Sequence, residues 1–184
     1  MASTLADLHA PEAAKRVAAS QVIERAARME SSRARQKALG RRTVTAALIG
    51  VFDDAEAEVV RNAVVAIAEI GRRYLKDDRA YPAVVRLLGN SDAITRLWAV
   101  EAAVVLRGWA SLGDVSPLAR DRSAKVRAGV IRLVAGLALQ SDVPAAVRTS
   151  LQAMIAVAAD DRDRQVRECA TTLVRALAVP VGTA

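Results

Sequence analysis

Residues 53–71, DDAEAEVVRNAVVAIAEIG, decide the fold, because their pattern returns three more times along the chain. In each copy a polar turn leads into a helix-forming segment, and an arginine lies near the start of that segment. Apolar residues follow three, six, seven and ten positions after the arginine, which places them on one face of a helix. The arginines are Arg61, Arg96, Arg127 and Arg167, so they lie 35, 31 and 40 residues apart. This spacing is typical of stacked helical hairpins.

The four copies resemble HEAT repeats, of the short kind common in bacteria, over roughly residues 43–178. The resemblance rests on one turn residue and one arginine in each copy. The pairs are Asp54 and Arg61, Asn90 and Arg96, Asp121 and Arg127, and Asp161 and Arg167. In that family the turn residue and the arginine form a ladder between neighbouring repeats. The resemblance implies an all-α fold: an armadillo-type α-solenoid of about four helical hairpins with a helical N-terminal cap.

The second repeat departs from the family's pattern. Asn90 replaces the acid of the turn, Thr95 replaces the valine before Arg96, and one extra residue separates Asp54 from Arg61. We therefore expect the ladder to be weakest at the second repeat. In the third repeat, Gly and Pro between the helical segments leave room for only a very short leading helix.

The charge of the chain is unevenly distributed. Of the formal net charge of +7, residues 1–42 contribute nine Lys/Arg against four Asp/Glu, whereas residues 43–184 contribute eighteen against sixteen. The repeats are therefore nearly balanced, and the basicity belongs to the N-terminal segment. Aromatic residues make up only 3% of the chain, so small aliphatic side chains must form the core.

We predict four segments along the chain: a flexible start (1–11), a basic N-terminal helical cap (12–42), the HEAT-like solenoid (43–178) and a flexible tail (179–184). The cap is predicted because a solenoid must cover its open end. Its apolar stripe is expected to consist of Ala14, Ala18, Val22, Ala26 and Met29. The alternative is that the basic segment is a solvated interaction arm.

Nothing in the sequence predicts catalysis, a cofactor or a bound metal. His9 is the only histidine and Cys169 the only cysteine, so neither a nucleophile–base pair nor a cluster of zinc ligands is indicated. The aspartate pairs precede helices, where they serve as caps, and no glycine-rich phosphate loop is present. No apolar run is long enough to span a membrane. We therefore expect a non-enzymatic, cytoplasmic protein.

A binding surface is expected on the second, trailing helix of each hairpin, which usually lines the concave side of such stacks. Positions five and eight residues after each arginine avoid the apolar stripe. They place Glu69 and Glu101 in the first two repeats, and Arg132 and Arg175 in the last two. The mixed charge favours a protein partner, because a nucleic-acid track would favour one sign throughout. Trp98 and Trp109 are interpreted as packing between repeats, and the alternative is an exposed anchor for a binding partner.

Three functions follow as hypotheses. The leading one is a protein–protein interaction scaffold or adaptor that binds its partner through the solenoid surface. The alternative is a nucleic-acid-associated protein that contacts phosphates through the basic N-terminal segment, where no aromatic residues are available for base stacking. The basic residues that would contact phosphates are Arg28, Arg33, Arg35, Lys37, Arg41 and Arg42. A third hypothesis is an accessory factor of a lyase or modification system, as some bacterial HEAT-like proteins are.

Overall fold

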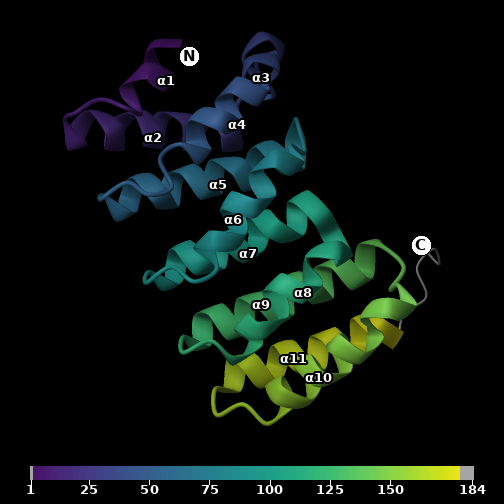
Figure 1. Cartoon of the computed structure of the whole chain (residues 1–184). Coiled ribbons are helices and arrows are strands. Elements are labelled where there is room, and N and C mark those ends of the chain that lie inside the picture. The colour runs from purple at the N-terminus through teal and green to yellow at the C-terminus, as the bar shows by residue number, and fades with distance from the viewer. Residues whose placement is uncertain (1, 179–184) are drawn as a thin grey trace. The chain divides into compact units, whose positions relative to one another are not determined.

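The structure, a computed structural model, describes residues 2–178, and these residues form helices joined by turns (Figure 1). The α-helices are α1 (Ala2–Asp7), α2 (Ala13–Met29), α3 (Arg33–Leu39), α4 (Arg42–Ile49), α5 (Ala57–Arg73), α6 (Tyr81–Leu87), α7 (Ala93–Arg107), α8 (Leu112–Val115), α9 (Ala124–Gln140), α10 (Arg148–Ala159) and α11 (Arg164–Ala178). Short 3-10 helices add η1 (Asp78–Ala80), η2 (Gly108–Ser111), η3 (Ser116–Arg120) and η4 (Ala145–Val147). The prediction of an all-α fold is confirmed. The predicted flexible tail lies outside the described residues.

The chain forms two compact units, of which the first ends at Leu106 and the second begins at Arg107. In the first unit α5 is the central helix, and nearly all of its residues from Val59 to Gly71 are buried. Helices α2 and α4 pack against it. Helix α7 comes so close at Gly71 that a methyl group there would lie only 2.9 Å from Val105 Cγ1. A small residue at position 71 is therefore required for this packing.

Helix α2 faces α5 with a different stripe from the predicted one. Its buried residues are Ala19, Ser20, Ile23 and Ala27. In contrast, Val22 is 55% exposed and Met29 is 75% exposed, and Ala14 and Ala18 also face solvent. The predicted stripe was therefore wrong. Ala19 and Ile23 follow Arg16 by three and seven positions, which are two of the offsets found in the repeats, so α2 presents the same face as a trailing helix.

The segment 1–11 differs from the predicted loose start, because it contains α1. Leu8, which follows this helix, is fully buried, and α1 packs on α2. The buried Leu8 side chain anchors the segment through the removal of its apolar surface from water. The hairpin of α1 and α2 thus precedes the hairpin of α4 and α5 in the first unit, joined to it by α3.

In the second unit α9 is the central helix and packs against α11, α10 and η3. The leading helix of the third repeat is short, as expected: four residues of α8 are followed directly by η3. Most members of the predicted repeat stripes are buried, but Val174 on α11 is 48% exposed. No later helix covers that face of α11 within the described residues.

The burial pattern of α2 predicts effects of very different size for substitutions at two adjacent residues. Replacing the fully buried Ile23 by alanine should lower the free energy of unfolding by about 2–4 kcal/mol, because it leaves a cavity against α5. Replacing the exposed Val22 by alanine should change it by less than about 0.5 kcal/mol. Urea or thermal unfolding followed by circular dichroism measures both. A larger effect of Val22→Ala than of Ile23→Ala would show that the other face of α2 is buried.

Candidate functional site

The turn before each trailing helix is built on the same hydrogen bond. The side-chain oxygen Oδ1 of the turn residue accepts a bond from the backbone N–H two residues later. These bonds join Asp54 to Glu56 (2.8 Å), Asn90 to Asp92 (2.9 Å), Asp121 to Ser123 (2.7 Å) and Asp161 to Asp163 (2.8 Å). Both Asp and Asn can accept such a bond, which stabilises a turn. This shared role explains why the second repeat tolerates Asn90.

The arginine six residues after the turn residue closes the same turn from the other side. Its Nη1 atom donates to the carbonyl oxygens of the turn residue and of the next residue. The bonds run from Arg96 to Asn90 (2.8 Å) and Ser91 (3.0 Å), from Arg127 to Asp121 (2.9 Å) and Arg122 (3.5 Å), and from Arg167 to Asp161 (2.7 Å) and Arg162 (3.1 Å). Such charge-assisted bonds satisfy carbonyl groups that lie outside the helix.

A ladder rung joins the third and fourth repeats within the second unit. Arg127 Nε donates to Asp161 Oδ2 at 2.6 Å, and Nη2 donates to Oδ1 at 2.8 Å. The two side chains are only 7% and 8% exposed. The hydrogen bonds from Arg127 lower the pKa of Asp161 below its ordinary value, and burial opposes this effect. The guanidinium and the carboxylate are therefore held together in their charged forms.

The same rung occurs in the first unit, between Asp54 and Arg16 of α2. Arg16 Nε lies 2.6 Å from Asp54 Oδ2, and Nη2 lies 3.1 Å from Oδ1. The Nη1 atom of Arg16 donates to the carbonyls of Ala10 and Pro11, six and five residues earlier. Here too the arginine lowers the pKa of Asp54. Sequence reasoning missed Arg16, although its offsets to Ala19 and Ile23 were a signal, because no Asp or Asn precedes it in the turn.

Arg61, the first arginine of the predicted ladder, does not pair with Asp54. Its Nε lies 3.5 Å from Asp92 Oδ2 and makes no hydrogen bond among the described residues, although that atom is buried. Asp92 Oδ2 instead accepts bonds from the N–H (2.9 Å) and the hydroxyl (2.8 Å) of Thr95. The connection from Arg61 to the second turn is thus an ion pair without the two hydrogen bonds seen between Arg127 and Asp161.

The two acids predicted for the binding surface are already paired. Glu69 is 5% exposed, and its Oε1 accepts a bond from Arg72 Nη1 at 2.9 Å. Arg72 also forms an ion pair with Glu101, and Arg73 Nε lies 3.5 Å from Glu69 Oε2. The expectation of an acidic surface in the first two repeats was therefore wrong. Helix α5 carries two arginines one turn after Glu69, and these neutralise both carboxylates.

An aromatic ring adjoins these charges. The guanidinium carbon of Arg28, on α2, lies 5.1 Å from the ring centroid of Trp98, on α7, within the range of a cation–π contact. Arg28 also pairs with Glu24, and Arg73 donates to the carbonyl of Arg28. Trp98 is half-buried. We call this group the trailing-helix cluster; it consists of Arg28 on α2, Glu69, Arg72 and Arg73 on α5, and Trp98 and Glu101 on α7.

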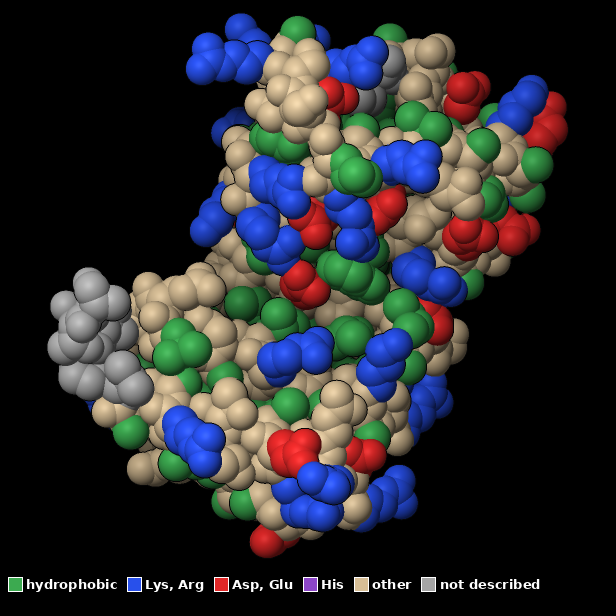
Figure 2. Space-filling view, turned by 180° about the vertical axis from the view of Figure 1, so that it is seen from behind, with side chains coloured by type: hydrophobic (Ala, Val, Ile, Leu, Met, Phe, Trp, Pro, Cys, Tyr) green, Lys and Arg blue, Asp and Glu red, His purple; other side chains and the backbone are tan. Residues whose placement is uncertain are grey.

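The remaining predicted surface residues lie in two other places. Arg132 on α9 and Arg175 on α11 are exposed in the second unit. The basic residues of the N-terminal segment are exposed around α3 and the start of α4; they are Arg33, Arg35, Arg41 and Arg42. Helix α3 contains no acidic residue, and Lys and Arg side chains project from the molecule in its region (Figure 2). Arg35 approaches Glu30 at 3.7 Å.

The residues considered for catalysis and metal binding are scattered. His9 is exposed, and Cys169 is half-buried, where burial raises the pKa of its thiol. Within residues 2–178, no three His, Cys, Asp or Glu side chains come together in a way that could hold a metal ion. Among the residues that the structure describes, none of the helices has both the length and the hydropathy that a bilayer crossing requires.

Several solved structures with the same fold are designed or engineered proteins. A designed armadillo repeat protein in complex with the peptide (KR)4 matches 98% of this chain and 82% of its own, with a TM-score of 0.68 and 18% identity. A computationally designed armadillo repeat protein for modular peptide recognition matches 96% and 81%, with a TM-score of 0.62 and 19% identity. An engineered protein matches 96% and 78%, with a TM-score of 0.66 and 16% identity. No protein-family model and no curated protein sequence matches the chain.

These similarities assign the fold. The chain is an armadillo-type, HEAT-like α-solenoid, as its repeats predict.

The geometry of the rung predicts a large difference between two arginines near the same turn. Replacing the buried Arg127 by alanine should cost about 1.5–3 kcal/mol of stability, because it removes charge-assisted bonds and leaves Asp161 without its partner. Replacing the exposed Arg162 should cost about 0–1 kcal/mol. Chemical unfolding at neutral pH measures both. Equal losses in the two variants would contradict the rung.

The pH dependence provides a control for this comparison. Because the folded-state pKa of Asp161 lies below its ordinary value of 3.8, the stability from the pair is present above that value and is lost as the pH falls through the folded-state pKa. The difference between the wild type and Arg127→Ala should therefore shrink in acid. A difference that stays constant below the ordinary pKa would indicate lost packing rather than a lost ion pair.

Proposed function

We propose that this protein is a non-enzymatic scaffold or adaptor that binds another protein through the surface of its trailing helices. The fold supports a binding role, since the designed armadillo protein that it resembles is in complex with a peptide. The observation that carries the proposal is the trailing-helix cluster, which brings a tryptophan and three arginines from three helices of the first unit together. Tryptophan and arginine are the residue types that most often dominate the energy of protein interfaces.

The cluster also retains capacity to bind. The side chains of Arg28, Arg72 and Arg73 are 40–44% exposed, so their remaining N–H groups reach solvent. Glu69 Oε2 is buried, lies 3.5 Å from Arg73 Nε and makes no hydrogen bond among the described residues, so a ligand would contact the guanidinium groups and not this oxygen. A polypeptide offers carbonyl oxygens that can accept hydrogen bonds from these groups. The three arginines of the cluster face two glutamates, which leaves a single positive charge in excess and favours a partner recognised by hydrogen bonds and ring contact over one recognised by a large net charge.

The proposal predicts that the partner is lost when the cluster is altered. Affinity capture with the full chain, quantified by mass spectrometry, should identify a protein whose binding weakens about tenfold or more in Trp98→Ala and Arg72→Ala. Arg86→Ala is the matched control, because Arg86 is an exposed arginine of α6 in the same unit, outside the cluster. Thermal melting confirms that each variant is folded. A partner that binds all three variants as well as the wild type would contradict the proposal.

The exposed basic surface of α3 and the start of α4 supports the nucleic-acid alternative. Under our proposal, binding to random duplex DNA is weak and does not respond to changes in this surface. Under the alternative, log K falls with log salt with a slope of about −0.9 for each phosphate contacted, and Arg41→Ala reduces that slope by about one contact. Fluorescence anisotropy between about 50 and 200 mM salt separates the two. Lys125→Ala, on α9, is the control.

The cytoplasmic location and the bacterial origin expected from the sequence stay predictions.

A further inference from the structure

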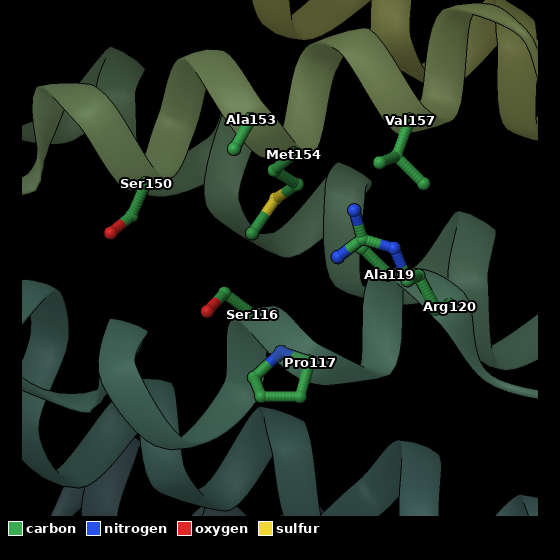
Figure 3. A pocket seen from close by; sticks show the side chains of 8 residues that line it. All are labelled: Ser116, Pro117, Ala119, Arg120, Ser150, Ala153, Met154 and Val157. Atoms are coloured by element: carbon green, nitrogen blue, oxygen red, sulfur yellow. The ribbon is translucent and has the colours of Figure 1, made fainter.

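A groove lies between η3 and α10 in the second unit (Figure 3). Its main hollow has a volume of about 240 Å³. Met154 and Val157 point into it from α10, and Pro117 faces them from η3. Met154 is 3% exposed and forms part of the floor, while Val157 is half-buried. The hollow thus offers an apolar floor of the size of one or two side chains.

The groove follows from the short leading helix of the third repeat. Helix α8 has four residues and passes directly into η3, whereas α10, the leading helix of the next repeat, has twelve. The shorter element does not cover the whole facing side of α10. Ala153, which lines the hollow, remains exposed as a result.

Polar groups surround the apolar floor. The hydroxyl groups of Ser116 and Ser150 lie at one end, and the guanidinium of Arg120 lies at the other (Figure 3). Arg120 is exposed, and no carboxylate is among the residues that line this hollow. A charged donor beside an apolar hollow is complementary to a ligand with an apolar side chain next to an anionic group.

A second hollow, of about 440 Å³, adjoins the first and shares Arg120 and Val157 with it. Its rim carries Arg122 and Arg162. Two of its three aspartates are already engaged, since Asp161 is held by Arg127 and Asp121 accepts the turn hydrogen bond. Asp160 is an exposed carboxylate that lines this second hollow, whereas the described lining of the first hollow contains no carboxylate. The anionic group of a ligand is therefore placed at the Arg120 end of the groove.

We propose that this groove binds an extended acidic peptide segment of a partner protein. An apolar side chain of the segment enters the hollow against Met154 and Val157, and a neighbouring Asp or Glu binds Arg120. The two serine hydroxyl groups bond to its backbone. This inference rests on the proposed scaffold function and adds a second contact, in a different unit from the trailing-helix cluster, with the chemistry of the segment that it takes.

The test uses peptides selected from a random display library on the full-length protein. The affinity of each selected peptide is then measured for four variants. Ala153→Trp fills the groove, and Ala156→Trp places the same side chain at an exposed position of α10 outside it. Arg120→Glu reverses the charge of the groove, and Lys125→Glu makes the same kind of reversal on an exposed residue of α9. Melting temperatures establish that all four variants are folded.

We expect selected peptides that carry Asp or Glu next to a large apolar residue. Their affinity should fall at least tenfold in Ala153→Trp and in Arg120→Glu, and should stay within twofold in Ala156→Trp and Lys125→Glu. Three outcomes would overturn the proposal that the groove binds an acidic peptide. They are the selection of basic or purely apolar peptides, selected peptides that are insensitive to the two groove variants, and no selected peptide at all. The same affinities are measured for Trp98→Ala and Arg72→Ala. Peptides whose affinity falls in these two variants instead would overturn the proposal for the groove and would still support the proposed scaffold function.

Discussion

The structure depends on an aspartate that serves two repeats at once. Asp161 accepts two bonds from Arg127 of α9, the trailing helix of the preceding repeat, and one from the N–H of Asp163 in its own turn. Asp54 does the same with Arg16 and Glu56 in the first unit. A buried ion pair is costly unless its remaining donors and acceptors are satisfied. Here the carbonyl groups of the turn satisfy the arginine, so the position of the turn and the rotation of the helix are fixed together.

Arg61 shows how strict this geometry is. Seven residues separate it from Asp54, whereas six separate Arg96, Arg127 and Arg167 from their turn residues. With this extra residue, Arg61 lacks the bonds to the turn carbonyl groups that the other three arginines make. Its buried Nε makes no hydrogen bond among the described residues. A shift of one position rotates a helical residue by about 100°, which moves the guanidinium away from the turn. The pairing therefore depends on spacing as much as on residue type.

The sequence was sufficient for the fold, because the repeat offsets recur and each repeat must bury the same face. It was not sufficient to predict an ion pair whose arginine lies outside the recognised repeats. The pairing of Asp54 with Arg16 depends on a helix whose turn carries no Asp or Asn. The face of α2 was predicted from a regular run of alanines, yet the stripe at Ala19 and Ile23 is buried, because the pairing of Arg16 fixes the rotation of the helix. Small side chains alone could not distinguish these two faces.

Unrecognised pairing also explains why the acidic binding surface expected from the sequence was wrong. Counting charges along the trailing helices indicated an acidic first half, but Glu69 and Glu101 share Arg72 as a partner. Residues 43–184 carry nearly equal numbers of acids and bases, and several of these charges pair within a unit to hold helices in register. Charges that are paired within the protein contribute little to the attraction of a partner. The groups proposed for binding lie outside these pairings or are only partly engaged in them: a tryptophan beside partly exposed arginines in the first unit, and Arg120 beside an apolar hollow in the second. Recognition by this protein should therefore depend on a few local groups rather than on the net charge of its surface.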